Sequence, residues 1–105
     1  MSEKLLKIIK HYGVMHQLKY FQSEVFELNE AIINCENGGY EYDYEDYEKL
    51  EKKYKEHITE EIADVMVLVS QFKKYYCIDD TEILKIMNEK IERQLNRIKG
   101  EKNGK

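Results

Sequence analysis

Four carboxylates lie in two pairs beside the apolar faces of two predicted helices. Glu24 and Glu27 are three residues apart, and so are Glu61 and Asp64. Residues at this spacing lie on the same face of a helix. If the two helices pack antiparallel, the pairs can face each other and form an oxygen-only, negatively charged site. Such a site suits Mg²⁺, with Mn²⁺ as a substitute.

The position of the second pair favours a bound cation, although the sequence leaves an alternative open. At about 100° per residue, Glu61 falls inside the apolar sector of its helix and Asp64 lies on the edge of that sector. A buried carboxylate costs several kcal/mol unless it is paired or bound to a metal ion. Glu61 is equally able to pair with His57 or with a lysine. A single Glu-x-x-Glu in a chain with 36% charged residues is ordinarily a solvated helix face.

Basic side chains follow one flank of the last predicted helix. Lys90, Arg93 and Arg97 are spaced as neighbours on a helix surface. Beside an anionic metal site they would suit a polyphosphate, because cations can neutralise the phosphate oxygens that the metal leaves free. The alternative is a basic last turn favoured by the helix dipole, which accounts for Arg97.

Other chemistries fit the residues less well. Neither a GxxxxGK nor a GxGxxG loop occurs, and no Glu-x-x-His is present, so nucleotide-binding glycine loops and di-iron bundles are disfavoured. The three histidines lie near no nucleophile motif. Cys35 and Cys77 have no metal-ligand spacing and are expected to be reduced thiols.

The chain breakers predict an all-α fold of about four helices in one domain over residues 1–105. There is no proline, and the remaining breakers are Gly13, the pair at 38–39, the turn at 78–80 and Gly100. The predicted elements are a short N-terminal helix, a helix over about 14–35, a helix from after 43 to about 76, and a helix that begins at 80 or 81 and ends before 100, followed by a polar tail at about 100–105.

Two details of this pattern carry alternatives. Thr59 is a candidate cap for a new helix start before Glu60, which would interrupt the long helix. The segment 36–48 holds six acidic residues and four tyrosines. It is interpreted either as a solvated loop or as a lid whose tyrosines stack on a base.

Size and charge limit the partners that the protein is expected to have. A chain of 105 residues buries a thin core, so we expect homo-oligomerisation to a dimer or tetramer. The net charge of −4 argues against nucleic acid as the main partner. The longest apolar run, 65–69, is far below the roughly 20 residues of a membrane span, and the N-terminus lacks a secretory pattern. These features predict a cytoplasmic protein.

Taken in order along the chain, the motifs resemble the MazG-type all-α nucleoside triphosphate pyrophosphohydrolases, whose signature is EExxE, a spacer and then ExxD. The chain has SEVFE at 23–27 and EEIADV at 60–65, with YGVMHQ at 12–17 and NEKIER at 88–93. Ser23 stands in place of the first glutamate, and the spacer at 28–60 is longer than is usual in the family. The resemblance covers roughly residues 12–98.

The resemblance implies hydrolysis of a nucleoside triphosphate to the monophosphate and pyrophosphate, in nucleotide-pool house-cleaning. It implies Mg²⁺ ligation by Glu24, Glu27, Glu61 and Asp64, with Glu24 or Glu27 as proton acceptor. Lys90 and Arg93 would neutralise the leaving pyrophosphate. The further substrate contacts that it suggests are Gln17, Tyr20 and Asn88. Two alternatives to an enzyme remain, a non-enzymatic helical interaction module and a nucleotide-binding sensor.

Overall fold

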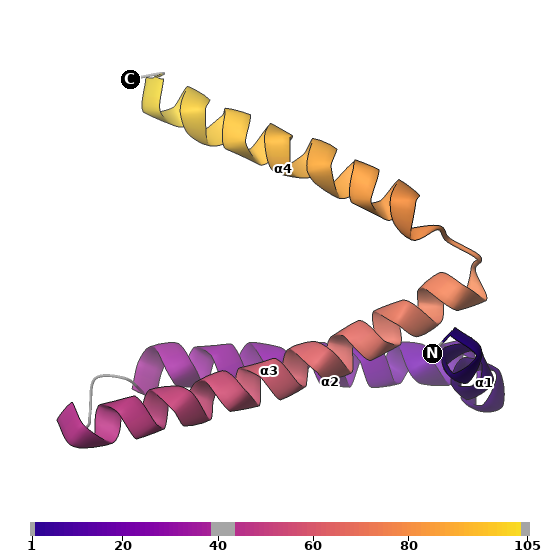
Figure 1. Ribbon diagram of the computed structural model, residues 1–105, viewed down its shortest axis with the longest axis horizontal. Coiled ribbons are helices and arrows are strands. Elements are labelled where there is room, and N and C mark those ends of the chain that lie inside the picture. The colour runs from indigo at the N-terminus through magenta and orange to yellow at the C-terminus, as the bar shows by residue number, and fades with distance from the viewer. Residues whose placement is uncertain (1, 39–43, 104–105) are drawn as a thin grey trace. The chain divides into compact units, whose positions relative to one another are not determined.

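The computed structural model describes the backbone of residues 2–38 and 44–103, and the side chains of these residues except 44–47 and 103 (Figure 1). In this part of the chain every regular element is a helix, which confirms the predicted all-α class. The helices are α1 (Ser2–Tyr12), α2 (Val14–Gly38), α3 (Tyr44–Tyr75) and α4 (Asp80–Asn103). Of the tyrosine-rich segment at 36–48 predicted to be a loop or a lid, residues 36–38 belong to α2 and residues 44–48 to α3, whereas residues 39–43 and the side chains of 44–47 lie outside the described residues.

The break between α1 and α2 depends on one glycine. Gly13 has a φ of +90°, a conformation that side-chain-bearing L-residues rarely adopt. Its N–H donates to the carbonyl of Ile9 at 2.8 Å, and its own carbonyl accepts from the N–H of Gln17 at 3.1 Å. The chain therefore turns sharply here while both helix ends keep hydrogen bonds, and α1 runs across the neighbouring helices (Figure 1).

We expect Gly13→Ala to lower the free energy of unfolding by about 1–2 kcal/mol, because a Cβ disfavours the left-handed backbone. No atom lies within 4 Å of a Cβ built at Gly13, so steric overlap would not contribute. Urea denaturation measures the effect. Gly100→Ala is the matched control: this site is also open but helical, so alanine should be neutral or stabilising. Equal stability of Gly13→Ala and the parent chain would refute the backbone argument.

One alternative that the sequence left open, a helix start at Thr59, and one predicted boundary, a helix end before Gly100, are wrong. α3 continues through residues 57–59, where the hydroxyl of Thr59 donates to the carbonyl of Lys55 at 2.7 Å instead of capping a new start. α4 continues past Gly100 to Asn103. A lone glycine costs a helix only about 1 kcal/mol relative to alanine, and it ends one only when it takes a left-handed conformation. Gly100 has no positive φ.

The chain divides into two compact units, residues 1–75 and 76–105. In the first unit, α2 and α3 run antiparallel, and α1 packs on both (Figure 1). The buried apolar side chains of this unit come from all three helices, and Phe21 meets Phe72 edge to face with ring centroids 5.7 Å apart. These buried residues are Leu5, Ile9, Ala31 and Leu68. The prediction of a single domain over 1–105 stays a prediction.

The second unit contains α4, which begins where the sequence predicts. The Asp79 carboxylate accepts a hydrogen bond from the N–H of Thr81 at 3.1 Å, the usual pattern of an N-cap. Six large apolar side chains on this helix are exposed: Leu84, Ile86, Met87, Ile91, Leu95 and Ile98. None of the described helices is long and apolar enough to cross a membrane.

Candidate metal centre

Three carboxylates from two helices converge in the first unit. Glu24 of α2 and Glu61 and Asp64 of α3 each offer one oxygen, and these oxygens all lie within 4.8 Å of one another. Glu24 is only 6% exposed and Glu61 only 9%, whereas Asp64 is exposed. The cluster therefore has two enclosed carboxylates and one that opens to solvent. We call these three residues the carboxylate cluster.

The register of the two helices produces this convergence. The buried residues of α2 are Gln17, Glu24 and Ala31, which follow one another at seven-residue intervals and so share one face over successive pairs of turns. On α3, Glu61 and Leu68 are also seven residues apart, with Asp64 one turn beyond Glu61. Glu24 and Glu61 are thus buried in the interface by the same periodicity that buries their apolar neighbours, and Asp64 lies at its exposed edge.

The hydrogen bonding of the cluster is incomplete. Among the described residues, Glu24 Oε2 and Glu61 Oε2 are enclosed atoms without a hydrogen-bond partner. Unsatisfied buried carboxylate oxygens are costly, and a bound cation would remove that cost. The atoms available as metal ligands are all carboxylate oxygens, which fit Mg²⁺ or Mn²⁺ better than softer metals. The residues present therefore fit the metal that the sequence predicts.

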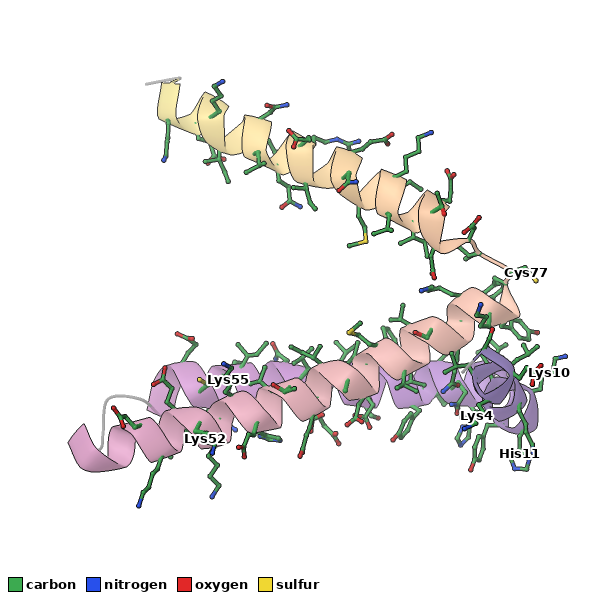
Figure 2. All side chains as sticks on the ribbon, viewed as in Figure 1. Lys4, Lys10, His11, Lys52, Lys55 and Cys77 are labelled. Carbon is green, nitrogen blue, oxygen red and sulfur yellow. The ribbon has the colours of Figure 1, made fainter. Side chains whose placement is uncertain are left out.

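His57 contacts the carboxylate cluster and carries a positive charge when its imidazole is protonated. Its Nε2 lies 3.4 Å from Glu61 Oε1, one helical turn along α3. This is the pairing that the sequence left open as an alternative, and it occupies only one of the two Glu61 oxygens. The lysines labelled on α1 and α3 in Figure 2 are Lys4, Lys10, Lys52 and Lys55; they are exposed and form no ion pair with the described acidic residues.

Tyr20 contacts the cluster from one turn earlier on α2. Burial raises the pKa of Glu24, the hydrogen bond from the Tyr20 hydroxyl lowers it, and the charges of Glu27 and Asp64 raise it again, with a net upward shift. The same hydrogen bond and the charge of Glu24 raise the pKa of Tyr20. Tyr20 therefore stays protonated and orients Glu24, while Glu24 binds a proton more readily than an ordinary glutamate.

The stability of the metal-free protein should consequently fall as pH rises through the pKa of Glu24. The folded state binds this proton more tightly than the unfolded state, whose pKa is near the ordinary value of 4.5. The stabilisation is thus complete below that value and is lost as pH rises through the higher folded pKa. Urea denaturation in EDTA from about pH 4 to about pH 8 measures it.

Glu24→Gln should remove this pH-dependent contribution, since the amide does not titrate. Glu30→Gln is the matched control, because Glu30 is an exposed residue of the same helix and its replacement makes the same change in charge. If Glu24→Gln retained the full pH dependence of the parent chain, Glu24 would not be its source.

The structure brings together three of the four predicted metal ligands. Glu27 is exposed on α2 and interacts with Glu24, but it is not part of the group within 4.8 Å. Of the predicted substrate contacts, Tyr20 forms a hydrogen bond with Glu24, and Gln17 lies two helical turns before Glu24 on the same face of α2. Asn88, Lys90 and Arg93 are exposed on α4, in the second unit.

Gln71 is a buried polar residue that the sequence-based prediction omitted. It is 2% exposed, and its Oε1 accepts a hydrogen bond from Gln17 Nε2 at 2.9 Å. A polar residue between Leu68 and Phe72, on the apolar side of α3 and seven residues after Asp64, is the sequence feature that points to it. Its partner cannot be read from local spacing, because Gln17 is 54 residues away.

Comparison with known proteins gives no relative. No protein-family model matches the chain, and neither a curated protein nor a solved structure matches it significantly. The geometry therefore supports a small all-α protein with a carboxylate cluster, and its function is argued from that cluster.

Proposed function

We propose that the protein is a Mg²⁺-dependent nucleoside triphosphate pyrophosphohydrolase of the MazG type, releasing a nucleoside monophosphate and pyrophosphate. The observation that carries the proposal is the pair of enclosed, unpartnered oxygens on Glu24 and Glu61 beside Asp64. A cluster that serves stability alone would gain from donors at these oxygens. A site for a divalent cation instead requires them to be free.

Each residue has a proposed part in the reaction. Glu24, Glu61 and Asp64 hold the metal, and Tyr20 orients Glu24 through its hydroxyl. Mg²⁺ supplies a Lewis acid that polarises phosphate oxygens and acidifies water in the site. Glu27, which is exposed beside Glu24, is available as a further ligand or to accept the proton of the attacking water.

The remaining predicted contacts belong to α4. Lys90 and Arg93 would neutralise the charge that develops on the leaving pyrophosphate, and Asn88 would donate hydrogen bonds to the substrate. All three are exposed and belong to the described part of the second unit. Hydrolysis of free nucleotides for pool house-cleaning would take place in the cytoplasm, where the sequence predicts the protein to be.

A homo-dimer or tetramer is proposed as the working form. Its support is the exposure of large apolar side chains on α2 and α3, including Phe26 and Met66, as well as on α4. Exposed large apolar side chains on each of these helices are what an interface with another copy would cover. The same observation favours the second candidate function, a non-enzymatic helical interaction module, in which these surfaces bind partner helices.

Product analysis decides between the two functions. The protein is incubated with Mg²⁺ and a panel of ribo- and deoxyribonucleoside triphosphates, and the products are separated by ion-exchange chromatography. Monophosphate with pyrophosphate supports the proposal. Diphosphate with phosphate would assign a different reaction, and no turnover by a folded sample would favour the interaction module or the nucleotide-binding sensor.

A further inference from the structure

A pocket lies between α1, α2 and α3, on the Gly13 side of the carboxylate cluster. Its volume is about 340 Å³, at the lower end of the range of small-molecule sites, about 300–1,000 Å³. We call it the amide pocket. It is lined by Ile8, Tyr12, His16, Gln17, Tyr20 and Gln71. Neither the metal nor the phosphates of the proposed reaction account for this mixture of aromatic and amide side chains.

The aromatic residues of the pocket offer flat surfaces. Tyr12 and His16 stack on each other with centroids 5.0 Å apart and ring planes inclined by 16°. His11 also contacts Tyr12 edge to face, with centroids 4.7 Å apart, yet the Tyr12 side chain stays 54% exposed and so keeps surface available to a ligand. Exposed aromatic faces of this kind bind planar heterocycles by stacking, whatever the identity of the base.

The amides supply a polar edge of defined orientation. Gln17 Oε1 lies 2.8 Å from His16 Nδ1, and Gln17 Nε2 donates to Gln71 Oε1 at 2.9 Å. Because Gln17 Oε1 can only accept, His16 donates from Nδ1, and the chain of hydrogen bonds holds each amide in one orientation. The group left over at the end of this chain is the Nε2 of Gln71.

Gln71 Nε2 is an unused donor with access to the pocket. It donates to no described residue. Enclosed polar side-chain atoms without a partner occur among the described residues only at Glu24 and Glu61, so Gln71 Nε2 is not sealed off. A donor held in place at the edge of an apolar pocket selects a ligand that presents an acceptor there.

The pocket and the carboxylate cluster are connected and suitably spaced. Tyr20 lines the pocket and also bonds to Glu24 of the cluster. Gln17 precedes Glu24 by two helical turns, and Gln71 follows Asp64 by two turns, a separation of roughly 10 Å along each helix. A nucleotide bridges such a separation, with its phosphates at the carboxylates and its base at the amides.

We propose that the amide pocket binds the base of the substrate, stacked against Tyr12, and that Gln71 Nε2 donates to a carbonyl oxygen on it. This inference rests on the proposed function for the position of the phosphates. The predicted substrate class is nucleotides with an oxo group at that edge, such as uracil, over those with an amino group, such as cytosine.

The first test uses nucleosides without phosphate, so that it does not depend on catalysis. The full-length, ¹⁵N-labelled protein is titrated in EDTA with uridine and with cytidine, and the side-chain amide signals of Gln17 and Gln71 are followed by NMR. Uridine should shift these signals in a saturable way and bind about tenfold more tightly than cytidine. No saturable shift, or equal binding of the two nucleosides, would overturn the inference.

Substitutions test which side chains of the amide pocket bind the base. Tyr12→Ala, at an exposed position, should weaken uridine binding about tenfold while leaving the protein folded. Gln71→Glu replaces the donor by an acceptor of the same size and should shift the preference toward cytidine. Gln22→Glu makes the same change at an exposed position outside the pocket and should leave both affinities unchanged. If Tyr12→Ala bound uridine like the parent chain, the pocket would not be the base site.

Turnover separates this inference from the proposed function. Inorganic tripolyphosphate serves as a competitor that has no base. Tyr12→Ala should leave the inhibition constant of tripolyphosphate unchanged but raise KM for uridine triphosphate. Nucleoside binding at the amides without turnover of any triphosphate would support the pocket and refute the enzyme. Turnover without base preference, and without nucleoside binding, would support the enzyme and refute the pocket.

Discussion

Glu61→Gln is expected to lower Mg²⁺-dependent turnover by roughly 100-fold or more. The amide keeps the size of the side chain but loses the charge, and one of its two oxygen positions becomes a donor that cannot bind a cation. Glu61 is 9% exposed and its Oε2 has no hydrogen-bond partner among the described residues, so this enclosed oxygen is free to bind the cation and its loss removes a ligand. Steady-state kinetics on the best triphosphate of the panel measures the effect.

The adjacent glutamate provides the control for this prediction. Glu60→Gln makes the same change in charge one residue earlier on α3, but Glu60 is exposed and not part of the cluster. It should retain the turnover of the parent chain. Glu61→Gln should also leave the metal-free protein as stable as the parent or more stable, because it removes a buried charge whose Oε2 has no partner and whose only ion pair, among the described residues, is with the half-exposed His57. Undiminished turnover by Glu61→Gln would refute the assigned metal site and favour the interaction module.

Millimolar Mg²⁺ is expected to raise the melting temperature of the first unit. A ligand that binds only the folded state stabilises it by about 2.7 kcal/mol at a hundredfold excess over Kd. In a domain of this size each kcal/mol corresponds to about 4–8 °C. Here the cation would also relieve the repulsion among Glu24, Glu61 and Asp64. Thermal melts followed by circular dichroism, with Mg²⁺ and then excess EDTA, measure the shift.

Ionic strength must be separated from specific binding in this experiment. Sodium chloride at the ionic strength of the Mg²⁺ sample screens the charge of the exposed Asp64. It screens the charges on the enclosed oxygens of Glu24 and Glu61 much less. The shift should therefore be much larger with Mg²⁺, and it should be lost in Glu24→Gln and retained in Glu30→Gln. An equal rise with sodium chloride would mean that the cluster is screened and does not bind the metal.

The helices could be predicted because their causes are local. The absence of proline, the 3.6-residue periodicity of apolar positions and the break at Gly13 are features of short segments, and the structure confirms an all-α chain with α2 beginning at Val14. The errors were also local. Thr59 and Gly100 have residue types that favour helix ends, yet both lie inside helices because nothing in their backbone conformation or tertiary contacts ends the helix there.

The sequence by itself determined which carboxylates share a helix face, because spacing along one helix sets the direction of each side chain. Only the tertiary structure decided that Glu24 and Glu61 are enclosed together beside the exposed Asp64, while Glu27 stays outside this group. Likewise, only the tertiary structure paired Gln71 with Gln17 across 54 residues. The physical reason is that the register between two helices is set by how their side chains pack along the whole interface, which no local spacing specifies.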